Sequence, residues 1–271
     1  MLKKNMKLSV IIVNYNHKYF PRLALEALEK SKTDFEFEVI FVDNNSDPAD
    51  ESIGFLRDAA KENRIILIES PKNIGFGAGN NLGIKKSNGE YILLHNPDTT
   101  VLPNSLQQMV DYLAKHSEVG LLGPKLVYSN GDIQDSCRRF MRFSDLIIKR
   151  TPLRNINPWK KRLKHYLMED FDHNKTQPVD LITGAMMLAR RDFLWDKLHG
   201  FDERYFLFME DFDLCQRTWA AGKEVVYYSD VSILHYHKRL SGGGFFGQFM
   251  KKTFWLHLIS SAKYFWRWRK R

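Results

Sequence analysis

The amino-acid sequence predicts an α/β protein with a mostly parallel central sheet flanked by helices. Short β-branched, apolar runs alternate with helical patterns through the first half of the chain, and polar residues follow the ends of the strands. A chain of 271 residues, 44% of them hydrophobic, can bury a sizeable core. Its composition excludes a disordered, collagen-like or disulfide-stapled protein.

The first half contains strands and helices in alternation. Strands are expected where residues are apolar and β-branched, at 8–13, 37–43, 65–68 and 91–94. Helices are expected between and after them, at 20–30, 50–61, 79–87 and 103–115. Strands that alternate with helices pair in parallel through crossover connections, so we expect βαβ units.

The second half is less regular. Residues 138–175 are basic and weakly periodic, and we expect an inserted, partly mobile segment there before regular structure resumes at 179–189. Because no repeat or low-complexity linker divides the chain, we expect one domain over residues 1–240, followed by a helical tail over 241–271. The domain would have two halves, at about 1–118 and 119–240.

The net charge of +9 is unevenly distributed. Residues 138–165 carry ten Lys or Arg and one acid, Asp145, whereas residues 245–271 carry seven Lys or Arg and no acid. The rest of the chain therefore has a net charge of −7. Two basic segments on an acidic body indicate an anionic partner, either nucleic acid or an anionic membrane surface.

Cysteine usage and hydropathy indicate the compartment. Cys137 and Cys215 lie far apart without a metal-ligand spacing, which indicates a reducing compartment and argues against a zinc site. The apolar run 8–13 is too short for a signal-peptide core, and no run approaches the roughly 18–20 residues that span a bilayer. We therefore expect a protein on the cytosolic side.

Polar residues gather where the strands end. Asn14 follows the first strand, Asp43 ends the second, and Asn96-Pro97-Asp98 follows the fourth. Ligands of open α/β sheets bind beyond these carboxyl ends. The Asp98 carboxylate suits Mg²⁺ or Mn²⁺, which prefer oxygen ligands and bind diphosphates, although Asn-Pro-Asp is also an ordinary turn sequence.

A glycine-rich stretch, residues 73–81, follows the third strand and opens a helix. Its glycine spacing does not fit the dinucleotide-binding fingerprint, because the third glycine would fall on Asn80 or Leu82. Two interpretations remain: a flexible turn with helix-capping residues, or a loop whose backbone approaches a ligand closely.

An acidic cluster, Glu210-Asp211-Phe212-Asp213, begins a helix. The helix dipole favours acids in a first turn, and Asp213 is placed to pair with Arg217 four residues on. The apolar residues 205–209 precede the cluster, and a carboxylate among apolar neighbours has a raised pKa that suits general-base catalysis. Further on, His235 follows a short strand and is either structural or a metal or phosphate contact.

Taken in order, these motifs resemble family 2 glycosyltransferases, which have the Rossmann-like GT-A fold. The matching segments are 10–16, 42–46, 73–81, 96–98, 183–185, 200–203, 210–214 and His235, spread over roughly residues 7–240. Within the family, the sequence resembles the rhamnosyltransferase-like enzymes of bacterial surface polysaccharide assembly, such as those of O-antigen or capsule synthesis.

The resemblance implies a role for each matching residue. The implied nucleotide-sugar-binding residues are Val13, Asn14, Tyr15, Asp43, Asn45, Asn73, Gly75, Phe76, Asn80, Asn96 and Asp98. Asp98 and His235 would hold a divalent metal, Mg²⁺ or Mn²⁺, on the donor diphosphate. Asp211 would be the general base, with Gly184 and Glu210 on the acceptor side. Asn96 stands where many relatives have the first Asp of an Asp-x-Asp motif, so this site has one negative charge fewer.

The implied activity is inverting transfer of a sugar from a dTDP- or UDP-sugar, dTDP-rhamnose among them, to a hydroxyl of a glycan or lipid-linked acceptor. A nucleotidyltransferase is an alternative, but it would place a basic, glycine-rich phosphate loop where this chain has residues 14–17. A nucleic-acid-binding protein would use the basic segments but leaves the acidic cluster without a purpose. We therefore expect no nucleic-acid partner.

The tail, residues 245–271, combines nine aromatic residues with its seven basic ones. Trp255, Leu258, Ala262 and Trp266 share one face of a helix. Such a helix is expected to hold the protein peripherally on the inner face of the cell membrane, because aromatic residues favour the headgroup level and basic residues favour anionic lipids. The alternative is a terminal helix that packs on the catalytic body.

Overall fold

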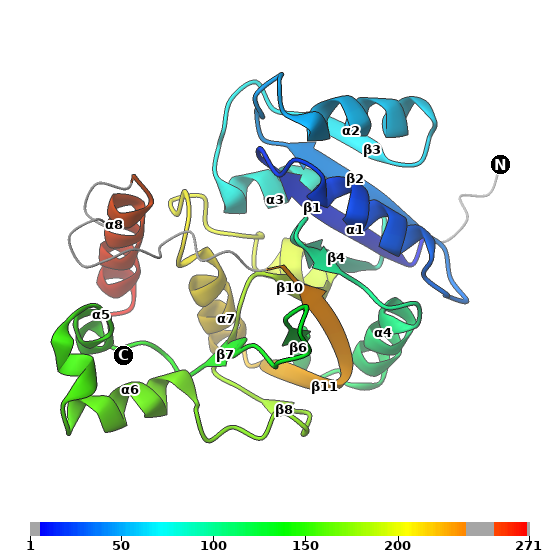
Figure 1. The fold of residues 1–271 in the computed structure, drawn as a ribbon. Helices are drawn as coiled ribbons and strands as arrows, with labels where there is room; N and C mark the ends of the chain where they lie inside the picture. Colours follow the sequence, from blue (N-terminus) through cyan, green and yellow to red (C-terminus); the bar gives the residue numbers. More distant parts are fainter. Residues whose placement is uncertain (1–5, 237–251, 270–271) are drawn as a thin grey trace.

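The computed structural model describes residues 6–236 and 252–269 (Figure 1). Its main sheet runs in the order β3-β2-β1-β4-β10-β6-β11-β5, with β8 paired to β11, and β7 pairs with β9 in a second, small sheet. The strands are β1 (Leu8–Asn14), β2 (Phe37–Asp43), β3 (Ile66–Glu69), β4 (Tyr91–His95), β5 (Thr99–Thr100), β6 (Val119–Val127), β7 (Cys137–Arg138), β8 (Gln177–Pro178), β9 (Leu181–Ile182), β10 (Met186–Arg190) and β11 (Glu224–His235). The helices are α1 (Phe20–Glu29), α2 (Glu51–Lys61), α3 (Phe76–Lys86), α4 (Ser105–Lys115), α5 (Phe143–Arg150), α6 (Trp159–Leu167), α7 (Glu210–Ala220) and α8 (Lys252–Arg267).

The first four long strands form the predicted parallel sheet. β3, β2, β1 and β4 pair in parallel, and so do β6 and β11. β10 runs antiparallel between β4 and β6 and joins the two parallel groups into one sheet. The carboxyl ends of β1, β2 and β4 therefore meet at one edge, as the sequence predicts.

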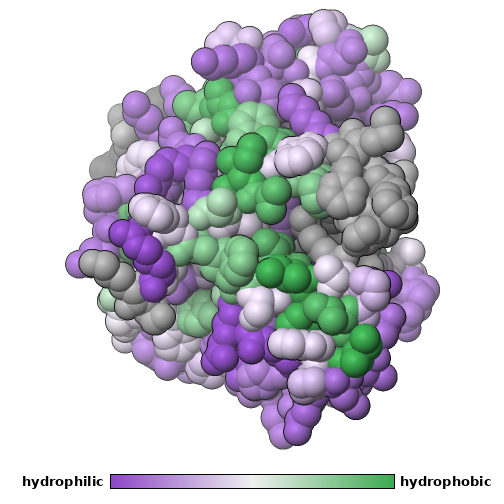
Figure 2. All heavy atoms as spheres, turned by 90° about the vertical axis from the view of Figure 1, so that its left-hand side faces the viewer, coloured by the Kyte–Doolittle hydropathy of each residue, from purple (hydrophilic) through white to green (hydrophobic). Residues whose placement is uncertain are grey.

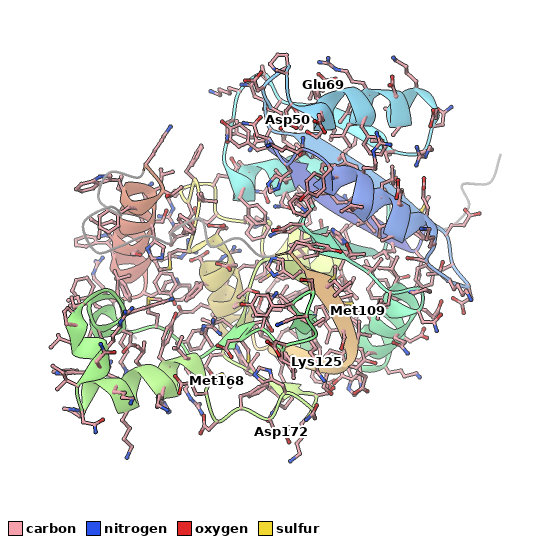
Figure 3. All side chains as sticks on the ribbon, in the orientation of Figure 1. Asp50, Glu69, Met109, Lys125, Met168 and Asp172 are labelled. Carbon is pink, nitrogen blue, oxygen red and sulfur yellow. The ribbon has the colours of Figure 1, made fainter. Side chains whose placement is uncertain are left out.

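Side chains of the buried strands alternate between two hydrophobic layers. Val10 and Ile12 of β1 pack with α1, α2 and α4 on one face of the sheet, where Met109 of α4 also lies (Figure 3). Ile11 faces the opposite layer, which includes Ile84 of α3 and Leu214 of α7. Because both faces are covered, the strands are continuously apolar, as is typical of parallel strands between helices.

One stretch of the second half is more regular than its weak periodicity indicates. The basic stretch 138–175 contains α5, a short 3₁₀ helix (Pro152–Asn155) and α6, and its being an insertion stays a prediction. Its few apolar residues account for this order: Leu146 and Tyr166 are buried in a third hydrophobic cluster shared with α7 and α8. A segment with weak hydrophobic periodicity therefore still forms helices when its apolar residues pack against other elements of the chain.

The described part of the tail packs on the rest of the chain. In α8, Ser260, Ser261 and Tyr264 are buried, and the Ser260 hydroxyl donates to Leu207 O at 2.8 Å. The first part of the predicted tail, residues 241–251 with their aromatic side chains, lies outside the described residues. No described helix combines the length and the apolar character that crossing a bilayer requires.

Candidate active site

A buried hydrogen-bond network joins the ends of β1 and β2. Asn14 donates from Nδ2 to Asp43 Oδ1 at 2.9 Å, and Ser46 donates to the same carboxylate from its backbone N–H (3.0 Å) and its hydroxyl (2.6 Å). Asn14 Oδ1 is buried with no hydrogen-bond partner among the residues described. Three other predicted site residues adjoin this network. Val13 is buried, whereas Tyr15 and Asn45 are exposed. The network fixes the buried pair, and the exposed neighbours lie where a ligand can reach them.

The glycine-rich stretch connects this network to the second half of the chain. Asn44 donates to Asn73 Oδ1 at 3.1 Å and to Gly75 O at 3.0 Å. Gly75 has a φ of +92°, and a Cβ there would lie 2.3 Å from Phe206 O. Only glycine tolerates both that backbone conformation and that close approach.

The same stretch begins α3 at Phe76, three residues before the expected start. Gly79 packs against Val13, since a Cβ there would lie 3.0 Å from a Val13 methyl group, and buried Asn80 donates to Phe76 O at 3.0 Å. Gly79 and Asn80 therefore lie inside the helix, where packing and a hydrogen bond to the preceding turn account for them, and Gly75 stands at the N-cap without a side-chain cap. A role for Asn80 in donor binding stays a prediction.

Asp98 and His235 face each other beyond the ends of β4 and β11. His235 Nε2 lies 3.6 Å from Asp98 Oδ2, and the Tyr236 backbone N–H donates to Asp98 O at 2.9 Å. Burial raises the pKa of Asp98, but the hydrogen bond and charge of His235 and the charge of His17 outweigh it, so this pKa lies below its usual range. Asp98 is therefore an anionic carboxylate in a largely buried position.

Gln134 holds the His235 ring in place. Gln134 is buried, donates from Nε2 to His235 O at 2.8 Å, and has Oε1 2.8 Å from His235 Nδ1. Because an amide oxygen only accepts, His235 donates from Nδ1 to Gln134. This hydrogen bond fixes the ring and leaves Nε2 facing Asp98, the ring nitrogen that would ligate a bound cation.

The donor set at this edge fits a divalent cation. Asp98 Oδ1 and Asn96 Oδ1 are both buried without a hydrogen-bond partner among the described residues. No group of three or more His, Cys, Asp or Glu side chains suited to a metal occurs within residues 6–236 and 252–269. Mg²⁺ is commonly bound by one or two carboxylates together with substrate phosphates, so a small protein ligand set agrees with a cation shared with a diphosphate.

Glu210 and Asp211 place a pair of carboxylates at the start of α7, of which Glu210 is buried and Asp211 is half-buried. Asp211 accepts from the Gly184 N–H at 3.0 Å and from the Phe212 N–H at 2.9 Å. Burial raises the pKa of Asp211, and these two N–H groups only partly offset it. Burial and the neighbouring Asp211 charge raise the pKa of Glu210 further, well above the usual value. Of the two carboxyl groups, Glu210 is therefore the one whose protonated form the fold favours more.

The backbone before this pair is strained. Phe208 and Met209 have φ values of +68° and +70°, in the left-handed region that costs a non-glycine residue about 1 kcal/mol or more. Such residues persist where the surrounding structure holds them, and they cluster at functional sites. Here they turn the chain abruptly into α7 and place Glu210 and Asp211 in its first turn.

Asp213 has a structural role. It is fully buried, accepts from Arg217 Nε at 2.7 Å as the sequence predicts, and accepts from Trp268 Nε1 at 3.0 Å. Arg267 Nε lies 3.2 Å from the same carboxylate. With both oxygens engaged, Asp213 is excluded as the base.

Backbone hydrogen bonds connect the Asp98 side to the acid pair. The Asn96 N–H donates to Ala185 O at 2.9 Å, and Ala185 follows Gly184, whose N–H binds Asp211. Phe76 also lies close to this connection, because a Cβ on Gly184 would be 3.7 Å from Phe76 Cε1. Residues predicted separately as donor, metal and acceptor contacts thus belong to one continuous region.

Several residues of this region carry no assigned role in the sequence analysis. Asn44 and Ser46 lie inside a matching motif, so the motif itself points to them. Gln134 has no such signal, since it reaches His235 across 101 residues. His17 lies near Asp98 and Asp50, and burial lowers its pKa.

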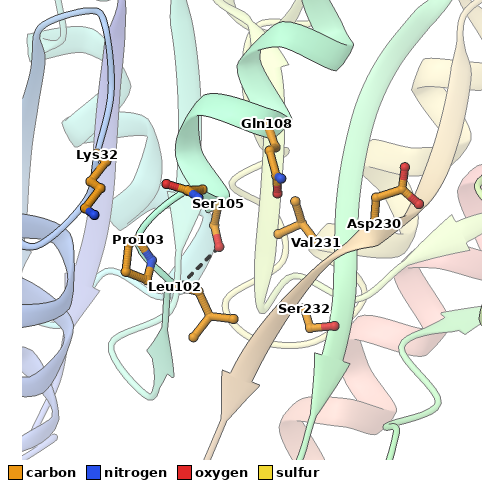
Figure 4. Close-up of a pocket in the computed structure, with 9 residues that line it drawn as sticks. Lys32, Leu102, Pro103, Ser105, Gln108, Asp230, Val231 and Ser232 are labelled. Atoms are coloured by element: carbon orange, nitrogen blue, oxygen red, sulfur yellow. Dashed lines mark hydrogen bonds between the residues drawn. The ribbon is translucent and has the colours of Figure 1, made fainter.

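A separate pocket of about 380 Å³ lies between the start of α4 and β11 (Figure 4). Ser105, Asp230 and Lys32 are among its lining residues, and none of the predicted site residues lines it. The Leu102 N–H donates to the Ser105 hydroxyl at 3.1 Å, which ties the loop before α4 to the first residue of the helix. The pocket is therefore distinct from the candidate active site.

Comparisons with known proteins agree with this arrangement. The model of a family described as glycosyl transferase family 2 matches residues 9–197. The chain is 28% identical over 190 residues to N-acetylglucosaminyl-diphospho-decaprenol L-rhamnosyltransferase of Mycobacterium tuberculosis, a match that covers 65% of this chain and 60% of that relative. It is also 28% identical over 266 residues to rhamnosyltransferase WbbL of Escherichia coli K12, covering 94% of this chain and 91% of the relative.

A solved structure has the same fold. The crystal structure of GalNAc-T7 with UDP, GalNAc and Mn²⁺ matches with a TM-score of 0.66 at 14% sequence identity, covering 88% of this chain and 44% of that one. At that identity the likeness concerns the fold alone. The chain spans about 60% of the length of the mycobacterial relatives that it matches.

Proposed function

The chain belongs to glycosyl transferase family 2, and on that premise we propose that it is an inverting, metal-dependent glycosyltransferase of cell-surface polysaccharide synthesis. The proposed donor is a dTDP- or UDP-sugar, with dTDP-rhamnose first, because two relatives are named rhamnosyltransferases. The proposed acceptor is a hydroxyl of a glycan or of a lipid-linked sugar, since the mycobacterial relative is named for a diphospho-decaprenol-linked sugar.

The observation that carries this proposal is the state of the Asp211 carboxylate. It accepts from two backbone N–H groups, its pKa is raised by burial beside Glu210, and it remains partly accessible. A positioned carboxylate with a raised pKa is a more effective proton acceptor near neutral pH than an ordinary aspartate. Backbone contacts connect it to Asn96 and Asp98, where a nucleotide diphosphate would lie.

The proposed reaction is a single displacement. Asp211 takes the proton of the acceptor hydroxyl while the hydroxyl oxygen attacks the anomeric carbon of the donor sugar. The bond from that carbon to the diphosphate oxygen breaks on the opposite side, its electron pair leaves with the nucleoside diphosphate, and the configuration inverts. The raised pKa of Glu210 favours its neutral form, which would add no negative charge beside Asp211.

Asp98 and His235 are the residues proposed to hold the divalent cation, with Gln134 orienting His235 and the Asn96 amide oxygen beside them. When bound, the cation neutralises charge that develops on the leaving diphosphate. On the donor side, we propose that the Asn14–Asp43 network shapes the nucleoside site. Exposed Tyr15 and Asn45 lie next to it, and Asn73 and Gly75 position the loop that ends at Phe76.

We further propose that the protein works at the inner face of the cell membrane, where a lipid-linked acceptor would be presented. This placement agrees with the basic, aromatic tail and with the name of the mycobacterial relative. Membrane contact would be peripheral.

A nucleotide-sugar screen tests the proposal. Thermal shift with Mn²⁺ should show stabilisation by a nucleoside diphosphate, and dTDP-rhamnose should be turned over to dTDP in the presence of a sugar-diphospho-lipid acceptor. Nuclear magnetic resonance of the product should show the inverted anomeric configuration. Absence of transfer from every dTDP- and UDP-sugar, or a product that retains configuration, would contradict it.

A further inference from the structure

Two basic segments that are far apart in the sequence lie side by side in the structure. The Phe143 ring at the start of α5 contacts the Phe265 ring of α8, with centroids 5.5 Å apart. Leu146 of α5, Tyr166 of α6 and Tyr264 of α8 are buried in one hydrophobic cluster. Figure 1 shows α5, α6 and α8 gathered at one end of the molecule. We call the outer surface of these three helices and the short 3₁₀ helix the α5–α8 face.

Large apolar side chains are exposed on this face. Trp266 is 71% exposed, Ile156 55% and Ile259 51%, and Phe143, Ile147 and Leu258 are also exposed. Figure 2 looks onto this end of the molecule and shows hydrophobic residues as a band bordered by hydrophilic ones. Single exposed apolar residues are common on proteins, but a contiguous group of them marks an interaction surface.

The same face is basic. The described part of the tail, residues 252–269, contains four Lys or Arg and no acid. On the middle segment, Arg154, Lys160 and Lys161 are exposed and form no salt bridge among the described residues. Internal pairs hold other basic side chains, for example Arg162 with Asp145 at 2.6 Å. The remaining charge is available to an anionic partner.

We propose that the α5–α8 face docks on the surface of an anionic phospholipid bilayer. Trp and Phe suit the headgroup level and aliphatic side chains suit the acyl boundary, while each Lys or Arg near an anionic surface adds about a fivefold increase in binding. Single-stranded nucleic acid fits less well, because it stacks its bases on aromatic rings, whereas Ile147, Ile156 and Ile259 are aliphatic. The proposed membrane-binding face is therefore composite: the middle segment and the tail each supply a part of it.

The face is built onto the acceptor side of the active site. Met209 and Phe212, which flank Glu210 and Asp211, belong to the hydrophobic cluster beneath it. Lys263 of α8 donates to Arg204 O at 2.6 Å in the loop before α7. The inference that docking brings Asp211 to a lipid-linked acceptor rests on the proposed function; the docking itself does not.

Co-sedimentation of the full chain with vesicles tests the docking. Phosphatidylcholine vesicles that contain phosphatidylglycerol should bind the protein in a salt-sensitive way, and phosphatidylcholine alone should bind it much more weakly. Ile147→Ser/Ile156→Ser in the middle segment and Ile259→Ser/Trp266→Ser in α8 should each weaken binding about tenfold or more. Lys160→Glu/Lys161→Glu should weaken it by at least about fivefold.

Matched controls lie on other surfaces. Leu102→Ser is an exposed apolar residue before α4, and Lys85→Glu/Lys86→Glu reverses two exposed charges on α3; both should leave vesicle binding unchanged. All variants alter exposed side chains, and their melting temperatures show whether the fold is kept.

Three outcomes would overturn the composite face. The first is binding that only the α8 variants reduce, which would assign it to the tail alone. The second is vesicle binding that none of the variants changes. The third is an absence of vesicle binding combined with oligonucleotide binding or self-association that the same variants abolish. Transfer to a short water-soluble acceptor, measured in parallel, separates the two proposals. Docking without transfer refutes only the proposed glycosyltransferase activity. Transfer without docking refutes only the proposed membrane docking of the α5–α8 face.

Discussion

Asp98 and Asp211 are the same residue type at two ends of one site, yet their environments shift their pKa values in opposite directions. Asp98 faces His235 and His17, whose interactions outweigh its burial and favour the ionised form. Asp211 has Glu210 and apolar side chains around it, and burial favours its protonated form. The comparison supports the proposal that one carboxylate holds a cation and the other accepts a proton.

The largest effect is expected from Asp211→Asn. The amide keeps the size of the side chain but cannot take a proton, so the transfer rate should fall by about 10²–10⁴-fold, the usual contribution of a general base. Binding of the donor nucleotide, measured by calorimetry, should stay near that of the unaltered protein. Asp172→Asn, at an exposed position, is the control. Near-normal turnover with saturating acceptor would show that Asp211 is not the base.

Asp98→Ala is expected to have the next largest effect, on binding instead of proton transfer. Loss of this carboxylate should weaken nucleoside diphosphate binding about tenfold or more in Mn²⁺ or Mg²⁺, and much less in a chelator, because the cation supplies most of the attraction. Calorimetry with and without metal distinguishes the two conditions. An equal loss in both would give Asp98 a structural role.

Gln134→Leu tests whether Gln134 orients the His235 ring for metal binding. Without the amide oxygen, the His235 ring loses the hydrogen bond that fixes its tautomer, and metal affinity should fall about 10-fold, the lower end for such supporting residues. The Mn²⁺ concentration needed for half-maximal transfer should rise while the rate at saturating Mn²⁺ is largely kept. Gln134→Glu, which restores an acceptor oxygen, should recover part of the affinity. If Gln134→Leu instead lowers the saturating rate and leaves the Mn²⁺ requirement unchanged, Gln134 acts on the fold and not through His235.

The smallest effect on activity is expected from Glu210→Gln. Because the raised pKa of Glu210 favours its protonated form, the isosteric amide should change the transfer rate by no more than a few-fold. A loss as severe as that of Asp211→Asn would mean that the ionised form of Glu210 is needed.

Glu210→Gln should also change how stability depends on pH. A carboxyl group whose pKa is raised by folding stabilises the protein below its unfolded pKa, about 4.3 for Glu, and loses that contribution as the pH rises through its folded pKa. The variant lacks this loss. Its stability relative to the unaltered protein should therefore increase as the pH rises from the unfolded pKa of Glu210 to its folded pKa, and should level off above that. Urea unfolding at a series of pH values measures this, and parallel stability profiles would show that Glu210 ionises normally.

The sequence by itself determined the regular part of the molecule and its family. Apolar β-branched runs located the four parallel strands of the first half, because a strand buried on both faces needs apolar residues throughout. The ordered motifs identified the glycosyltransferase family and the GT-A fold. They also placed Asn14, Asp43 and Asp98 at one sheet edge, since the ends of parallel strands meet there. The pairing of Asp213 with Arg217 followed from helical spacing alone.

Only the tertiary structure decided what those residues touch. Gln134 meets His235 across 101 residues, and α5 meets α8 through Phe143 and Phe265, contacts that no local period encodes. The opposite pKa shifts of Asp98 and Asp211 depend on neighbours supplied by other elements, which a sequence does not specify one by one. Periodicity reflects which side of a strand or helix is buried, whereas hydrogen bonds, desolvation and charge depend on distances of a few ångströms that exist only once the elements have packed.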